Sequence, residues 1–126
     1  MGMTTVGLAL ASATFGNVGS PTAITHIALG SGTTAFATTQ TTLVTEIVAS
    51  GLVRTAATPT QVTTTVTNDT TQITYTWTAT GSATVAESGV FNAVAAGTMP
   101  CRQVLGTART LATGDQITVT WKIAHA

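Results

Sequence analysis

Charged residues are scarce in this chain of 126 residues. Only 6% are Asp, Glu, Lys or Arg, and the four basic and four acidic side chains give a formal net charge of +0. An average soluble domain carries about 25% charged residues. Because the chain has no basic stripe for phosphates, we expect no nucleic-acid partner. Little self-repulsion opposes packing against neighbouring subunits.

Cysteine and long apolar runs are also scarce. Cys101 is the single cysteine, so no disulfide can form within the chain, as is typical of proteins that fold in a reducing cytoplasm. No apolar run approaches the roughly 18 residues that a spanning helix needs, so we expect no membrane segment. The first 16 residues lack the basic start of a signal peptide, and secretion is not expected.

Threonine, alanine and valine occupy the positions that charge leaves vacant, as in the threonine run at residues 63–65. β-Branched side chains favour strands. A hydrophobic content of 44% indicates a folded protein. We expect one domain over residues 1–126, with residues 1–23 as an N-terminal arm or helix.

Alternation of apolar and polar residues predicts the main strands. Ile117, Val119, Trp121 and Ile123 fall on one face of a strand that follows a Gly114-Asp115 turn. Alternation in residues 62–66 and 73–79 predicts a hairpin that reverses at Asn68-Asp69.

A second hairpin is predicted from residues 85–91 and 99–105, with Gly97 near its turn. Pro100 places the start of its second strand at an edge or a bulge. This pairing brings Glu87 and Arg102 within diagonal reach on neighbouring strands, so we predict an ion pair between them.

Shorter elements complete the prediction. Strands are expected at residues 24–29 and 52–57, a surface loop at 31–42, and a helix at 4–15 on the stripe of Leu8, Ala11 and Phe15. The predicted fold class is mainly β, a small antiparallel β-sandwich or barrel-like fold with one short N-terminal helix.

The sharpest apparent motif runs from Gly30 to Ala35 and matches the G-x-G-x-x-A of dinucleotide-binding proteins. The residues that follow are a poor helix start, and no alternation of strands and helices appears. We interpret these glycines as turn residues at the end of a strand.

No other constellation predicts a catalytic, cofactor or metal site. The bases His26 and His125 lie far apart, and Ser88-Gly89 lacks the preceding glycine of a nucleophile elbow. Cys101 is interpreted as structural. The four acids form no loop of oxygen ligands for a cation. They are Glu46, Asp69, Glu87 and Asp115.

Three aromatic residues allow two interpretations. Tyr75, Trp77 and Trp121 could form a platform on which a sugar stacks, or they could belong to the core. Their alternation with threonine favours the core.

Several segments, taken in order, resemble a family of small β-rich virion proteins of tailed bacteriophages. They are residues 24–34, 43–46, 54, 87–91, 97–99, 102, 114–115 and 121–123. The resemblance implies a virion component assembled in the host bacterial cytoplasm, without enzymatic activity or cofactor.

Two functions are compatible with such a component. The first is a capsid decoration or cement protein that binds the major capsid protein lattice and copies of itself, which the uncharged exterior favours. The alternative is a tail fibre, receptor-binding or adaptor module that contacts a host glycan. A fibre usually needs a shaft, and the chain has no coiled-coil or triple-helix repeat. For decoration, residues 1–15 and 31–42 are the expected working surfaces. For a tail fibre, loops such as residues 33–42 and the tryptophan faces would contact the glycan. A small enzyme ranks last.

Overall fold

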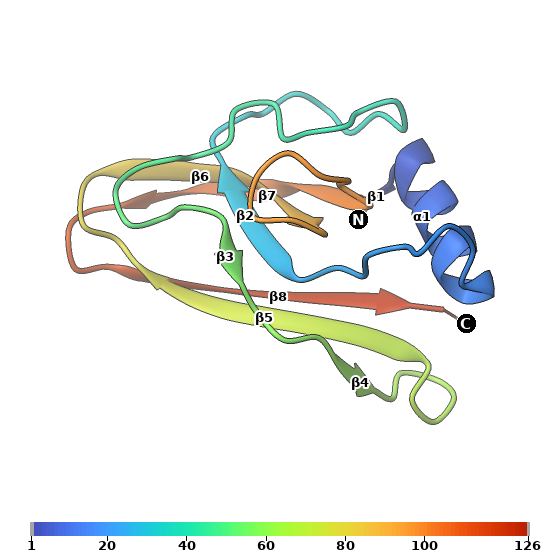
Figure 1. Cartoon of the computed structure of the whole chain (residues 1–126). Helices are drawn as coiled ribbons and strands as arrows, with labels where there is room; N and C mark the ends of the chain where they lie inside the picture. The colour runs from blue at the N-terminus through green and yellow to red at the C-terminus, as the bar shows by residue number, and fades with distance from the viewer. Residues whose placement is uncertain (1, 126) are drawn as a thin grey trace.

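Two antiparallel sheets and one helix make up the computed structural model, which describes residues 2–125 (Figure 1). The larger sheet has the strand order β1-β7-β6-β2-β3, and the smaller has the order β4-β5-β8. The elements are β1 (Gly2–Met3), α1 (Thr5–Gly16), β2 (His26–Gly30), β3 (Thr55–Ala56), β4 (Thr60–Val62), β5 (Thr70–Thr78), β6 (Ala83–Phe91), β7 (Cys101–Leu111) and β8 (Gln116–Ala124).

The mainly β prediction is confirmed in its sandwich form. Among the described strands, the two sheets do not join into a closed barrel. Their inner faces supply one buried cluster, in which Ile27 of β2, Val85 of β6 and Trp77 of β5 are no more than 2% exposed. Each such side chain contributes roughly 1.5–3 kcal/mol by leaving water.

Both predicted hairpins form. The one that reverses at Asn68-Asp69 joins β4 to β5, with Val62 opposite Thr70. β5 also pairs with β8 along nine residues, from Thr70 opposite Ala124 to Thr78 opposite Gln116. β6 pairs with β7, and Gly97 adopts a φ of +75° in the connection between them. Pro100 lies just before β7, so its missing N–H costs the sheet no hydrogen bond.

Two predicted strands are shorter than expected. β3 covers only Thr55–Ala56 of the predicted residues 52–57, and β4 ends at Val62. Residues 63–66 do not extend β4, and Val66 is 60% exposed. The Asp69 carboxylate instead accepts hydrogen bonds from three successive backbone N–H groups. These donors belong to Thr64, Thr65 and Val66. The side chain of the turn residue therefore curls the backbone into a loop, with Asn68 at a φ of +59°.

The predicted N-terminal helix is confirmed. Thr4 caps α1 by accepting from the Gly7 N–H at 3.0 Å, and its hydroxyl donates to the Met99 carbonyl. Gly7 is the one buried residue of α1. A Cβ at this position would meet the carbonyl of Pro100 and lie 2.5 Å from its Cα, so only glycine allows the helix to approach so closely.

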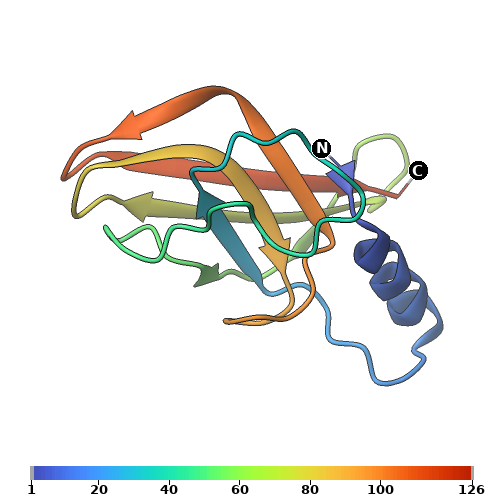
Figure 2. The ribbon, with the colours of Figure 1, turned by 90° about the horizontal axis from the view of Figure 1, so that it is seen from above.

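The apolar stripe expected to hold α1 in place lies in solvent. Leu8 is 58% exposed and Phe15 is 97% exposed. Apolar residues occur all around α1, so the spacing of apolar residues in the sequence could not show which face of the helix would pack against the sheets. Figure 2 shows the helix lying beside the sandwich rather than across the face of either sheet.

Candidate functional site

The predicted Glu87–Arg102 ion pair forms and is completely buried. Arg102 Nε lies 2.8 Å from Glu87 Oε1, and both side chains have 0% exposure. In the register of β6 and β7, Arg102 lies opposite Gly89, diagonal to Glu87. The pair needs further partners, because burial removes water from both charges.

The loop at residues 31–45 supplies those partners. The backbone N–H groups of Gly32 and Thr45 each donate to Glu87 Oε2 at 2.8 Å, and Val44 N–H donates to Oε1 at 3.0 Å. Arg102 also donates to the carbonyl of Thr34 at 2.9 Å. The ion pair therefore anchors the base of this loop to β6 and β7.

This arrangement explains the glycine motif. A Cβ on Gly30 would lie 2.6 Å from Glu87 Cγ, and one on Gly32 would overlap Glu87 Oε2 and lie 2.6 Å from Val44 Cβ. Neither glycine has a positive φ. The structure thus replaces the predicted turn role with another one, in which the missing side chains let the backbone reach a buried carboxylate.

Glu87 remains ionised at neutral pH. Burial is the largest single influence and raises its pKa, while the hydrogen bonds from Thr45, Arg102, Val44 and Gly32 lower it. The net effect is a pKa below its usual range. Because its carboxylate oxygens already accept four hydrogen bonds, we assign Glu87 a structural role.

A second ion pair was not predicted. Arg54 donates from Nη2 to Glu46 Oε1 at 2.7 Å and from Nε to Oε2 at 3.1 Å. Its guanidinium also lies 3.5 Å from the centre of the Phe91 ring and donates to the carbonyls of Ala93 and Ala96. The only feature of the sequence that could have indicated this pair is the scarcity of charge, because in such a chain each ionic residue is expected to have a specific partner.

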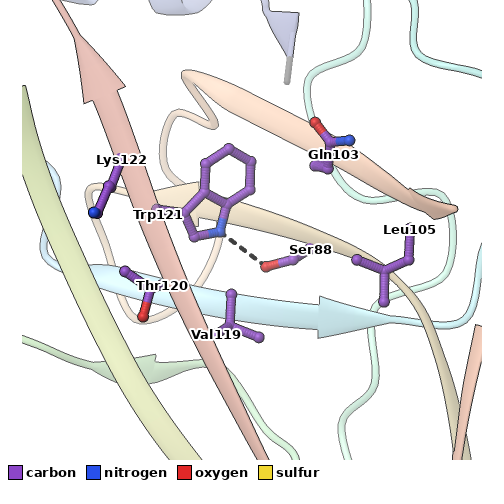
Figure 3. A pocket seen from close by; sticks show the side chains of 7 residues that line it. All are labelled: Ser88, Gln103, Leu105, Val119, Thr120, Trp121 and Lys122. Atoms are coloured by element: carbon purple, nitrogen blue, oxygen red, sulfur yellow. Dashed lines mark hydrogen bonds between the residues drawn. The ribbon is translucent and has the colours of Figure 1, made fainter. Parts of the chain in front are cut away.

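A groove lies beside the edge strand β8, with β7 on its other side (Figure 3). Its volume is about 650 Å³. Trp121 Nε1 donates to Ser88 Oγ at 3.0 Å, and Ser88 donates to the Ala28 carbonyl at 2.9 Å. Ser88 is therefore fully engaged. The lining residues of this β7–β8 groove are Ser88, Gln103, Leu105, Val119, Thr120, Trp121 and Lys122.

The chemistry of the β7–β8 groove suits docking rather than reaction. Lys122 is its one charged side chain, and no acid or histidine lines it. A nucleophile needs an adjacent base, which these residues do not supply.

α1 exposes uncharged, apolar side chains to solvent. Val6, Leu8 and Phe15 are all at least 36% exposed, and Val18 beyond the helix is 67% exposed. The helix contains no charged residue. We refer to these four residues as the α1 surface.

Comparison with known proteins identifies a relative for this architecture. A family model described as podophage GP4 fiber I protein gp80 matches residues 3–123. The chain belongs to this family. The match covers α1 and both sheets and confirms the resemblance to small phage virion proteins, so the chain is a virion structural protein. No curated protein and no solved structure is found to match it.

In this fibre-family fold, two of the three aromatic residues are core residues as predicted. Trp77 is 2% exposed and Trp121 is 5% exposed, whereas Tyr75 is 37% exposed and meets Trp77 edge-on at 4.9 Å between ring centres. The two buried indoles cannot offer their faces to a sugar.

Each histidine ring of the fibre-family chain lies against a threonine hydroxyl. His26 Nδ1 lies 2.7 Å from Thr25 Oγ1, and His125 Nε2 lies 3.0 Å from Thr71 Oγ1. Across residues 2–125, no group of three or more His, Cys, Asp or Glu side chains could hold a metal ion. The one helix within this range is too short to cross a membrane.

Cys101 lies buried at the start of β7, and we expect it to resist thiol reagents in the folded protein. Burial raises the pKa of its thiol to about 11. A maleimide at pH 7.5 should label Cys101 only after denaturant is added. Rapid labelling of the folded protein would contradict the burial of this residue.

Proposed function

We propose that this protein is a tail-fibre component of the virion that attaches to a neighbouring virion protein through the α1 surface. The main observation that supports this proposal is the exposure of an uncharged, apolar helix at the side of an otherwise well-packed sandwich. The fibre description of the family supports the tail location over the head.

α1 would bury apolar side chains by binding a partner. Phe15, at 97% exposure, contacts almost nothing in the free protein. Exposed apolar patches commonly mark interaction sites. Covering one Leu or Phe side chain contributes roughly 1.5–3 kcal/mol, so a few such contacts hold a subunit on a particle. The absence of charge in α1 fits a partner surface that is also apolar.

The loop at residues 31–42 is the second proposed contact surface, and it lies beside the start of α1, where Thr5 N–H donates to the Thr38 carbonyl at 2.8 Å. Glu87 and Arg102 fix its base, so its threonine hydroxyls are presented on a rigid support. A host glycan would meet these hydroxyls rather than the buried indoles of Trp77 and Trp121. The proposed role is structural and adhesive, with no catalytic step.

Capsid decoration is the second candidate. The nearly uncharged exterior, with 6% charged residues overall, suits packing on a lattice of major capsid protein as well as on a tail. The two candidates share the α1 surface and differ in the particle region that binds it.

The attachment is tested with virions that lack the protein and purified protein added back. The double variant Leu8→Glu/Phe15→Glu places two charges on the α1 surface, and we expect at least a tenfold loss of bound copies per particle. A matched control is Val48→Glu/Val94→Glu, since these valines are 79% and 70% exposed and lie outside the helix.

The control should bind like the unmodified protein. Equal binding by both double variants would remove α1 from the interface while leaving the fibre assignment intact. Saturable binding of the unmodified protein to isolated heads, but not to tails, would favour decoration instead.

A further inference from the structure

β8 is an unprotected edge of the three-stranded sheet. Within residues 2–125 it pairs only with β5, in a continuous register over all nine residues. Edge strands are normally shielded by proline, bulges or several charges. β8 contains no proline and no bulge, and Lys122 is its one charged residue.

Two hydrogen bonds reveal which backbone groups face the open edge. Ala79 N–H donates to the Asp115 carbonyl before β8, and His125 N–H donates to the Asp69 carbonyl after it. Antiparallel pairs alternate between bonded and non-bonded residues. Odd-numbered residues of β8 thus bond to β5, and the even-numbered ones from Gln116 to Ala124 direct N–H and C=O outward.

We propose that a second copy of this chain pairs with this edge, β8 antiparallel to β8, with Thr120 opposite Thr120 across a twofold axis. This register pairs all nine residues and matches the even-numbered residues with one another, as a bonded ladder requires. The two three-stranded sheets become one sheet of twice that width. A twofold contact uses the same surface on both copies.

The side chains favour this register. Thr74 and Thr120 form a hydroxyl pair at 2.8 Å on the outer face, and Thr76 and Thr118 form another at 2.7 Å. In the proposed dimer, Thr120 of the copy continues the Thr74–Thr120 hydroxyl pair across the interface. Cross-strand threonine pairs are favourable.

Charge supports self-pairing as well. The register places Lys122 opposite Thr118 of the copy, so no like charges face each other. It places Asp115 opposite His125 of the copy, so no two acids face each other there. With a formal net charge of +0, the two copies do not repel each other.

The β7–β8 groove opens beside the same strand, and Thr120 and Lys122 form part of its lining (Figure 3). Its half-buried apolar residues, Leu105 and Val119, gain cover when a second copy approaches β8. This contact is separate from the α1 surface, so it holds or fails independently of the proposed attachment.

Hydrogen exchange of the full chain tests the pairing directly. At concentrations where sedimentation velocity shows a dimer, we expect the amides of Thr118, Thr120 and Lys122 to exchange at least tenfold more slowly than after dilution to the monomer. The odd-numbered amides of β8 should change little, because β5 already protects them. Rapid exchange of the even-numbered amides at every concentration would overturn the proposal.

A pair of variants tests the register. Thr120→Lys places two lysines opposite each other at the axis, and we expect the dimer dissociation constant to rise at least tenfold. Thr60→Lys puts the same charge on the same face of β4, two strands away from the β8 edge, and should leave the dimer intact. A protein that stays monomeric at millimolar concentration, or an oligomer that Thr120→Lys does not weaken, would overturn the proposal.

Discussion

Glu87→Gln is expected to destabilise the fold by about 3–5 kcal/mol, because it leaves the Arg102 guanidinium buried without a counter-charge. The new amide nitrogen would also face backbone N–H groups that now donate to a carboxylate oxygen. For a domain of this size we expect a melting temperature lower by roughly 10–20 °C. Calorimetry or circular dichroism measures it.

Glu46→Gln is the matched control for this prediction. Glu46 also pairs with an arginine, but its side chain is 23% exposed, so water can replace part of the lost interaction. We expect a cost of about 1 kcal/mol. A melting temperature for Glu87→Gln equal to that of Glu46→Gln would show that the buried network contributes no more than a surface pair.

The same carboxylate makes stability depend on pH. The pKa of Glu87 is lowered on folding, so its contribution is complete above about pH 5 and is lost as the pH falls through the depressed native pKa. The free energy of unfolding should therefore fall with acidification below about pH 4.3. This part of the slope should be absent in Glu87→Gln.

Gly32→Ala is expected to destabilise the protein by about 1–3 kcal/mol, the usual cost of overpacking a filled interior. The added methyl group would overlap the Glu87 carboxylate and lie 2.6 Å from Val44 Cβ. The Glu87 carboxylate cannot move away from the added methyl group easily, because Arg102 and loop N–H groups hold it in place. Denaturant unfolding measures the loss.

Gly106→Ala provides the comparison, because nothing lies within 4 Å of a Cβ at that position and its φ is not positive. We expect a change within about 0.5 kcal/mol. Equal stability of the two alanine variants would contradict the close-approach role of Gly32.

The sequence predicted the parts of the fold that depend on local periodicity. Alternation of apolar residues located β5 and β8, and the hairpin predicted between β6 and β7 set a register that placed Glu87 beside Arg102. A diagonal pair follows from register alone, so this contact could be derived without knowing the rest of the fold.

Contacts between distant segments could not be predicted in this way. Arg54 meets Phe91 and the carbonyls that follow it only after β2, β3 and β6 have assembled. The packing face of α1 was hidden because the helix is apolar all round. The β7–β8 groove likewise lies between strands of the two different sheets, so the residue pattern of one strand cannot predict it.

The location of the protein on the virion tests the central claim most directly. Purified virions of the phage that encodes this chain can be labelled with gold-conjugated antibody against it and counted by electron microscopy, with particles lacking the protein as the blank. We expect label concentrated at the tail. Label spread over the capsid surface, or no label above the blank, would contradict it.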